Sequence, residues 1–338
     1  MECRTHQSRR AVAVGGQLNE PLYAAVDLGG ANIAAAIGTR DGRILGEVVC
    51  PTQAHEGPLR VLARIASLVR QLADTQAAPV AAVGMGIPGL VDIASGATRF
   101  LPNLPTQWRD VPAAAILAAK AGCPVYLLND ARMAALGELE YGWGRTASTF
   151  AFLTIGTGIW GAIVIDGKLR LGPLGAAGEI GHQTIVTDGP LCGCGNRGCL
   201  EALASGPAMI GDAVRTMLAG LAPGLHEIAG GSPSAVTPRT IAEAAGAGDG
   251  GALAVIERAA LYLGIGIANM VTALDPDMVV LGGGVAGMGE ALLVPVRRVV
   301  QDRVRMFPVD HLRIEASLVT GNAALPGGLA LAFRGGVI

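Results

Sequence analysis

The sequence predicts an α/β protein with two lobes, because a three-strand unit built around a glycine turn occurs in it twice. The first copy begins with an apolar strand at residues 22–27 and turns on Gly29-Gly30. The second copy begins at residues 149–155 and turns on Gly156-Thr-Gly158. In each copy a second strand, an Asp-Gly turn and a third strand follow at nearly the same spacing. This repeat favours an internal duplication, with a cleft between the two lobes.

Helices and short apolar strands make up most of the remaining chain. Residues 59–73 place Leu62, Ile65 and Leu72 at helical spacing, with arginines mostly on the opposite face. Further strands are expected at residues 32–37, 43–49, 79–86, 125–128, 161–165, 168–171, 278–281 and 313–316, and further helices at 111–121, 131–141, 251–274, 288–304 and 323–333. Residues 223–238 are rich in Gly, Pro and Ser, so we expect a surface connection there.

The composition is that of a folded protein. Hydrophobic residues make up 51% of the 338 residues and charged residues 15%, which excludes a disordered chain. The net charge of −2 provides no basic excess for nucleic acid. The longest uncharged apolar run, near residues 259–274, is shorter than the roughly 20 residues that a membrane span needs. It therefore predicts a buried helix, and because no targeting segment is found we expect a cytoplasmic protein.

Three of the six cysteines lie close together in the sequence. Cys192, Cys194 and Cys199, together with His182, provide three thiolates and one imidazole within 18 residues. This donor set suits a closed, tetrahedral and therefore structural Zn²⁺ site, and the intervening glycines would let a short loop surround the ion. Free loop cysteines are the alternative. Disulfides are not expected, because cytoplasmic thiols are kept reduced.

Both glycine turns are candidates for binding phosphate. Backbone N–H groups at Gly29 and Gly30 can approach phosphate oxygens closely, and Asp27 could hold Mg²⁺ through water. Thr157 adds a hydroxyl donor to the second turn, so the two turns could hold a nucleotide triphosphate from both lobes. A hairpin capped by Asp27 without a ligand is the alternative. The sequence contains no P-loop motif.

Several polar residues are candidates for binding and activating a sugar. Asn129 and Asp130 follow a buried strand, and ligands of α/β proteins collect at such strand ends. Asp130 could accept the proton of a substrate hydroxyl that attacks phosphorus, or it could only cap the following helix. Glu179 and Glu201 flank the zinc loop and could add acceptors for sugar hydroxyls. Solvated surface acids are the alternative for these two.

The order of the motifs resembles one known family. The matching segments are Asp27-Leu-Gly-Gly30, Gly84-Met-Gly-Ile-Pro-Gly89, Pro102-Asn-Leu-Pro105, Asn129-Asp-Ala131 with Ala134-Ala-Leu-Gly-Glu138, Ile155-Gly-Thr-Gly158, Gly178-Glu-Ile-Gly-His182, Cys192-Gly-Cys-Gly-Asn-Arg-Gly-Cys-Leu-Glu201 and Val280-Leu-Gly-Gly-Gly-Val285. Over about residues 22–334 the chain resembles the ROK family of bacterial sugar kinases and sugar-responsive repressors. Residues 188–201 look most like the glucokinases of that family.

The resemblance implies a two-lobed, actin-like ATPase fold of the ribonuclease H-like class. It implies a kinase that moves a phosphoryl group from ATP, with Mg²⁺, to the 6-hydroxyl of glucose, while N-acetylmannosamine, fructose, mannose and allose are alternative acceptors. The catalytic base would be Asp130. The implied sugar contacts are Asn103, Asn129, Asp130, Glu179, His182 and Glu201, the zinc ligands are His182, Cys192, Cys194 and Cys199, and the nucleotide contacts are Asp27, Gly29, Gly30, Asn32, Gly156, Thr157, Gly158, Gly282, Gly283 and Gly284.

The resemblance also suggests how the chain is divided. We expect a disordered tail at 1–20, a small lobe at 21–130 completed by about 317–338, and a larger lobe at 131–316 with the zinc loop and dimerisation helices. A homodimer or homotetramer is expected, without nucleic acid or membrane partners. Only 26 residues precede Asp27, which disfavours a repressor. A non-catalytic sugar sensor is an alternative, because Ala31 and Trp160 depart from the family pattern at the glycine turns.

Overall fold

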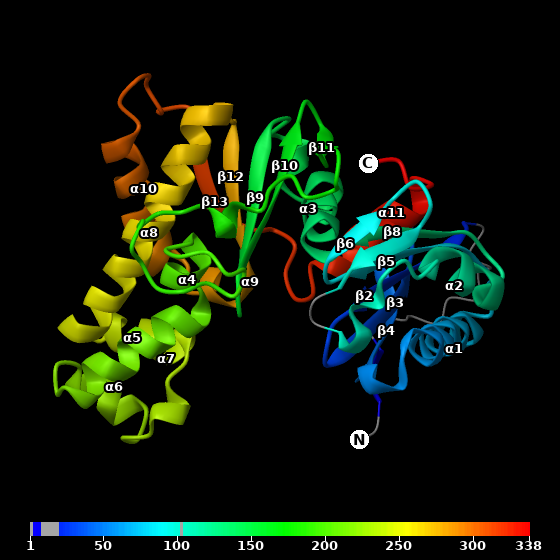
Figure 1. Ribbon diagram of the computed structural model, residues 1–338, viewed down its shortest axis with the longest axis horizontal. Coiled ribbons are helices and arrows are strands. Elements are labelled where there is room, and N and C mark those ends of the chain that lie inside the picture. Colours follow the sequence, from blue (N-terminus) through cyan, green and yellow to red (C-terminus); the bar gives the residue numbers. More distant parts are fainter. Residues whose placement is uncertain (1–2, 8–19, 102–103) are drawn as a thin grey trace. The chain divides into compact units, whose positions relative to one another are not determined.

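The computed structural model of the chain describes residues 3–7, 20–101 and 104–338, and its contacts divide the chain into two compact units (Figure 1). The first unit comprises residues 1–146, 164–177 and 318–338, and the second comprises 147–163 and 178–317. The predicted boundary at residue 130 is misplaced, because helix α3 (Asp130–Tyr141) packs against α11 (Ala324–Phe333) in the first unit. A sequence repeat shows where its second copy begins, but not where the helix between the copies packs.

The first unit contains a six-stranded mixed sheet in the order β1-β4-β3-β2-β5-β8. Strand β2 is antiparallel to β3 and parallel to β5, and β5 is parallel to β8. The strands of this unit are β1 (Arg4–Gln7), β2 (Leu22–Leu28), β3 (Asn32–Gly38), β4 (Ile44–Pro51), β5 (Val80–Ile87), β6 (Leu90–Asp92), β7 (Ala97–Phe100) and β8 (Val125–Asn129). Its other helices are α1 (Pro58–Gln76), α2 (Ala113–Ala121) and the 3₁₀ turns η1 (Ala54–Glu56), η2 (Pro105–Trp108) and η3 (Trp143–Arg145).

Helices cover both faces of this sheet. Successive side chains of a strand point to opposite faces, so Ala24 and Val26 of β2 join the core under α1 and α2. Ala25, between them, packs with Leu329 of α11 on the other face. Figure 1 shows α1 and α2 on the side of the sheet opposite α11. The sheet is therefore buried on both faces.

Glycines bring α11 very close to its neighbours. A Cβ atom on Gly327 would lie 1.7 Å from the carbonyl oxygen of Met133 in α3, and one on Gly84 of β5 would lie 2.0 Å from the carbonyl oxygen of Gly328. Only glycine fits at such distances, so the absence of side chains lets α11 lie directly on α3 and on the sheet. This contact determines where the first turn of α11 lies in the first unit.

The second unit contains a five-stranded sheet in the order β11-β10-β9-β12-β13, in which β12 is parallel to both β9 and β13. The strands of this sheet are β9 (Phe150–Ile155), β10 (Ile159–Ile165), β11 (Lys168–Arg170), β12 (Met278–Gly282) and β13 (Arg313–Ala316). Residues 164–177, which include β11 and the end of β10, are grouped with the first unit. The helices are α4 (Leu200–Ala204), α5 (Gly206–Leu218), α6 (Pro223–Ile228), α7 (Pro238–Gly246), α8 (Gly250–Leu274), α9 (Gly283–Ala286) and α10 (Glu290–Arg303), with 3₁₀ turns η4 (Ile180–His182) and η5 (Pro233–Ala235).

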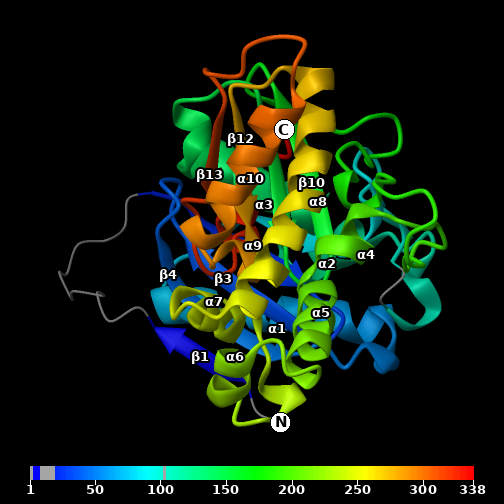
Figure 2. The same ribbon diagram turned by 90° about the vertical axis from the view of Figure 1, so that its left-hand side faces the viewer.

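Helix α8 is apolar and long enough, at 25 residues, to cross a membrane by length and composition. More than half of its apolar stretch is nevertheless buried within the protein. It lies beside α10 (Figure 2) and also contacts α4, α5 and α7. Its apolar residues therefore belong to the core of the second unit, as expected for a buried helix.

The segment 223–238 is more ordered than its composition predicts. Helix α6 begins there with Pro223 at its first position, where the missing N–H costs nothing. The carboxylate of Asp249 accepts the N–H groups of Gly224 and Leu225 at 2.6 and 3.2 Å, and thereby caps the helix. The expected surface connection therefore contains a short helix, which is capped by Asp249, 25 residues after Gly224.

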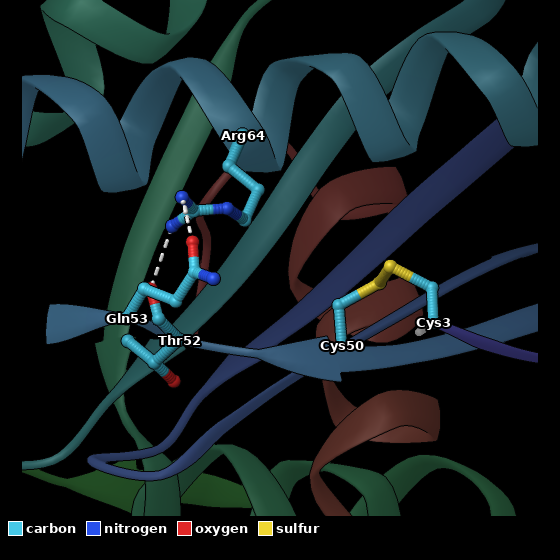
Figure 3. The surroundings of a disulfide bond; sticks show 5 residues. All are labelled: Cys3, Cys50, Thr52, Gln53 and Arg64. Atoms are coloured by element: carbon cyan, nitrogen blue, oxygen red, sulfur yellow. Dashed lines mark hydrogen bonds between the residues drawn. A yellow bond between two sulfur atoms is a disulfide. The ribbon is translucent and has the colours of Figure 1, made fainter. Parts of the chain in front are cut away.

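Part of the expected N-terminal tail is a strand. β1 pairs antiparallel with β4, with Arg4 opposite Val49. This register places Cys3 opposite Cys50, and the two form a disulfide with a Cα–Cα distance of 4.4 Å (Figure 3). The expectations of a disordered tail at residues 4–7 and of no disulfide are therefore wrong, since the strand pairing brings distant cysteines together.

Candidate functional site

The glycine turn of the first unit is held by residues of β3 and by Thr52, which follows β4. The Gly29 N–H donates to the carbonyl oxygen of Asn32 at 2.9 Å, which closes the turn after β2. Thr52 donates its N–H to the carbonyl of Ala31 at 2.8 Å and its hydroxyl to that of Gly29 at 2.7 Å. Both carbonyls thus point to Thr52, while Gly30, Ala31 and Asn32 remain exposed. The exposed turn can approach a phosphate, as the sequence predicts.

Arg64 of α1 holds the end of β4 in place. Its guanidinium donates to the carbonyl oxygen of Thr52 at 2.7 Å and to the side chain of Gln53 at 2.5 Å (Figure 3). It also pairs with Glu56. Sequence reasoning missed Thr52 and Arg64, because neither lies in a motif and their partners are set by the packing of α1 and β4.

Asp27 lies at the end of β2, directly before the turn. Burial raises the pKa of its carboxyl, and a hydrogen bond from Asn322 acts in the opposite direction. The Asn322 side-chain amide donates to Oδ2 of Asp27 at 2.8 Å. Asn322 precedes α11, so the partner of the first carboxylate comes from the far end of the chain, and no sequence motif indicated it.

Asn129 and Asp130 lie at the junction of β8 and α3. Oδ1 of Asn129 accepts the N–H groups of Ala131 and Arg132 at 3.1 and 3.3 Å, so Asn129 is the helix cap. The helix cap is therefore Asn129, one residue before the Asp130 that the sequence alternative named. Oδ1 of Asp130 accepts the Ala131 N–H at 2.8 Å from the first position of the helix.

Asn129 is oriented by two further contacts. The buried Arg132 donates to its Oδ1 at 2.9 Å, and its own amide donates to the carbonyl of Gly89 at 3.2 Å. Arg132 also donates to the carbonyl of Ala177 at 3.0 Å. Because Oδ1 already accepts three hydrogen bonds, a sugar contact of Asn129 would have to use its amide N–H.

The parallel strands bring these groups to one edge of the first sheet. Asp27 of β2 is opposite Gly86 of β5, and Asn129 of β8 is opposite Ile87. With neighbouring strands about 5 Å apart, Asp27 and Asn129 are separated by roughly 10 Å across the sheet. Asn103, the remaining predicted site residue of this unit, lies outside the described residues.

In the second unit, His182, Cys192, Cys194 and Cys199 form the predicted cluster. Their four ligand atoms lie within 4.8 Å of one another. Sγ of Cys194 and Sγ of Cys199 are 3.8 Å apart, and Sγ of Cys192 is 3.7 Å from Nδ1 of His182. A tetrahedral ion with Zn–S bonds of about 2.3 Å requires sulfur–sulfur distances of about 3.8 Å. The donor set and its spacing therefore fit Zn²⁺.

Binding of a cation to the cluster would displace thiol protons. Burial raises the pKa of Cys192, and it raises the pKa of Cys199 to about 12. These thiols would keep their protons at neutral pH without a positive ion to replace them. Nε2 of His182 lies 3.9 Å from a carboxylate oxygen of Glu179, so Glu179 is placed to orient the imidazole from behind.

Glu201 connects the cysteine loop with the second glycine turn. Its Oε2 accepts the N–H of Ile159 at 2.9 Å, and its Oε1 is 3.8 Å from Sγ of Cys192. A Cβ atom on Gly158 would lie 2.3 Å from Oε2 and 2.8 Å from the ring of Trp160, so a larger residue would have to displace these two side chains. The alternative of a solvated surface acid does not describe Glu201, because it is bonded to the backbone beneath the turn.

The second turn lies beside the other predicted nucleotide residues. The N–H of Gly156 donates to the carbonyl of Gly158 at 2.9 Å, with Thr157 between them. Gly282 of β12 is opposite Thr154 of β9, so Gly282, Gly283 and Gly284 follow the neighbouring parallel strand at the same edge. Gly283 has φ +83° and lies against the carbonyl of Ile155, which excludes larger residues.

Comparisons with known proteins agree with these observations. The ROK family profile matches residues 23–334. A glucokinase of Thermotoga maritima is 36% identical over 309 residues, which are 90% of this chain and 95% of that protein. An N-acetylmannosamine kinase of Escherichia coli is 34% identical over 310 residues, or 90% of this chain and 98% of that protein.

A solved structure gives the same result for the fold. The crystal structure of a ROK family glucokinase from Streptomyces griseus, in complex with glucose and AMPPNP, matches with a TM-score of 0.79 at 34% identity. The match covers 93% of this chain and 99% of that one. The predicted α/β, actin-like fold of ROK sugar kinases is confirmed, and the Cys/His cluster is compatible with its zinc loop.

We expect the purified protein to contain about one zinc ion per chain, and Cys199→Ser to lose it. The remaining three donors leave the tetrahedron incomplete, and the loop that they hold should loosen. Metal analysis and thermal melts measure both effects. Cys123→Ser, which removes a free thiol outside the cluster, is the control. Wild-type protein that folds without any metal and melts unchanged after chelation would contradict the assignment.

Asp27→Asn is expected to raise the melting temperature at neutral pH. Burial raises the pKa of Asp27, so the ionised form costs stability above that raised pKa, whereas asparagine stays neutral and can still accept the bond from Asn322. The gain should vanish as the pH falls below about 4, where Asp27 is protonated in the folded and the unfolded states. Melts across this range, with Asp74→Asn on the surface of α1 as control, measure it. An equal difference at every pH would contradict this reasoning.

Proposed function

Because this chain belongs to the ROK family, we propose that it is an ATP-dependent glucokinase that phosphorylates the 6-hydroxyl of glucose. The observation that carries the proposal is the β8–α3 junction, where Asn129 caps the helix and leaves Asp130 at its first position. A carboxylate there is suited to accept a proton from a hydroxyl. The likeness to a ROK glucokinase crystallised with glucose and AMPPNP supports the choice of substrates.

Asp130 acts as the general base in this proposal. It takes the proton of the attacking 6-hydroxyl while the oxygen approaches the γ-phosphorus. At the helix start Asn129 accepts the N–H groups of Ala131 and Arg132, and Asp130 shares the Ala131 N–H through its Oδ1. Arg132 keeps Asn129 in this orientation.

The glycine turns bind the phosphates. The exposed backbone of Gly30–Asn32 in the first unit and the turn Gly156–Gly158 in the second provide N–H donors, and Asp27 holds Mg²⁺ through water. Mg²⁺ neutralises charge on the phosphates when it is bound. Gly282–Gly284 lie at the same sheet edge as the second turn and would contact the adenosine.

The second unit recognises the sugar. The carboxylates of Glu179 and Glu201 accept hydrogen bonds from sugar hydroxyl groups, and His182 contacts the same sugar. The contacts proposed in the first unit are Asn103, Asn129 and Asp130. A zinc ion held by His182 and the three cysteines keeps the loop rigid. Since Glu201 also holds the Ile159 N–H, the same side chain contributes to the geometry of the phosphate turn.

We further propose that the protein works in the cytoplasm as a homodimer or homotetramer. The burial of α8 within the second unit supports a protein without a membrane partner. In that compartment we expect the Cys3–Cys50 bond to be opened to two thiols, because cytoplasmic cysteines are kept reduced.

Asp130→Asn is expected to lower kcat by about 10²–10⁴ while glucose still binds, because the amide cannot accept the hydroxyl proton. Coupled ADP release measures kcat, and calorimetric titration measures the glucose Kd. The matched control is Asp74→Asn, on the exposed face of α1, which should behave like the wild type. A kcat close to that of the wild type would rule out the role of Asp130.

The acceptor is tested by kcat/KM for glucose beside N-acetylmannosamine, fructose, mannose and allose. We expect glucose to give the highest value. A higher value for another sugar would replace glucose as the substrate but keep the kinase. No ADP release with any of these sugars would favour a non-catalytic sugar sensor and overturn the proposed activity.

A further inference from the structure

We propose that Asn322 is a positioning residue, which orients the Asp27 carboxylate for the magnesium ion of the nucleotide. The inference rests on the proposed function, because it assumes that Asp27 serves Mg²⁺·ATP. The carrying observation is the hydrogen bond of 2.8 Å from Nδ2 of Asn322 to Oδ2 of Asp27. The two residues are 295 positions apart in the sequence.

The orientation of the Asn322 amide is determined by α11. Oδ1 of Asn322 accepts the N–H of Ala324 at 3.1 Å. Since a backbone N–H can only donate, it requires the oxygen of the amide on that side. The NH₂ group must then face Asp27. The contact with the Ala324 N–H therefore determines that the amide donates a hydrogen bond to the Asp27 carboxylate.

The helix that carries Asn322 has a fixed place. α11 lies directly on α3 and β5 through Gly327 and Gly84, where a Cβ atom would collide with backbone oxygens. Asp27 is equally fixed, because β2 is paired on both sides, with β3 and with β5. The bond therefore joins two rigid elements and holds Oδ2 at one position.

A neutral partner has a consequence for charge. An arginine or lysine at this place would cancel the negative charge of Asp27 and compete with a metal ion. Among the described residues, the ion pairs of the protein do not include Asp27. The amide satisfies one oxygen of a partly buried carboxylate without supplying a positive charge, so the charge remains to attract Mg²⁺.

The first test separates the two contacts of Asn322, which are its bond to Asp27 and its acceptance of the Ala324 N–H at the start of α11. Serine at position 322 can still accept the Ala324 N–H with its hydroxyl, but it is too short to reach Asp27. We expect Asn322→Ser to raise the KM for Mg²⁺·ATP about tenfold, with the KM for glucose unchanged. Asn269→Ser, an exposed asparagine of α8, is the control. An unchanged KM for Mg²⁺·ATP would overturn the proposal, because it would leave only the helix-start role.

A second variant gives a readout that does not require activity. Asn322→Asp keeps the acceptor for Ala324 but places two carboxylates side by side, a pair that needs a cation. We expect MgCl₂ without nucleotide to raise the melting temperature of this variant by several degrees more than that of the wild type. Equal shifts would overturn the contact with Asp27. If no sugar is phosphorylated, the proposed function fails, yet this measurement still decides the role of Asn322.

Discussion

The parallel pairing of β2, β5 and β8 is the constraint on which the first unit's chemistry depends. It brings Asp27 and Asn129 to the carboxyl end of one sheet, with β5 between their two strands. The pairing of β9 with β12 repeats this in the second unit, where both strands end in glycine turns. Ligands of α/β proteins collect at such edges, because loops and helix starts there present backbone N–H groups. The duplicated fold thus supplies two edges of the same kind.

Features that depend on local order along the chain could be predicted from the sequence. The cysteine cluster is one, because its four donors lie within 18 residues and a short glycine-rich loop keeps them close enough to share one ion. The glycine turns are another, since a strand, two glycines and a returning strand specify a hairpin. The position of Asp130 at the end of a strand followed the same logic. The sugar contacts of Glu179, His182 and Glu201 stay predictions.

Partners that tertiary packing brings together could not be predicted. Thr52 reaches the turn at Gly29 only because β4 pairs with β3, and Cys3 meets Cys50 only because β1 pairs with β4. The boundary of the first unit was misplaced for the same reason, since α3 packs on α11 through glycines whose role the sequence does not show. Each of these contacts joins segments whose proximity depends on the whole sheet. Composition and spacing carry no signal for them.

The two carboxylates of the first unit share one structural solution. Each is accompanied by an asparagine that accepts N–H groups at the start of a helix: Asn129 at α3 beside Asp130, and Asn322 at α11 near Asp27. An amide accepts N–H groups at a helix start without adding a charge. At α3 the Asp130 carboxylate shares the Ala131 N–H with Asn129, and at α11 the Asn322 amide also donates to Asp27. The roles proposed for the two carboxylates differ, since Asp130 would accept a proton and Asp27 would attract a cation.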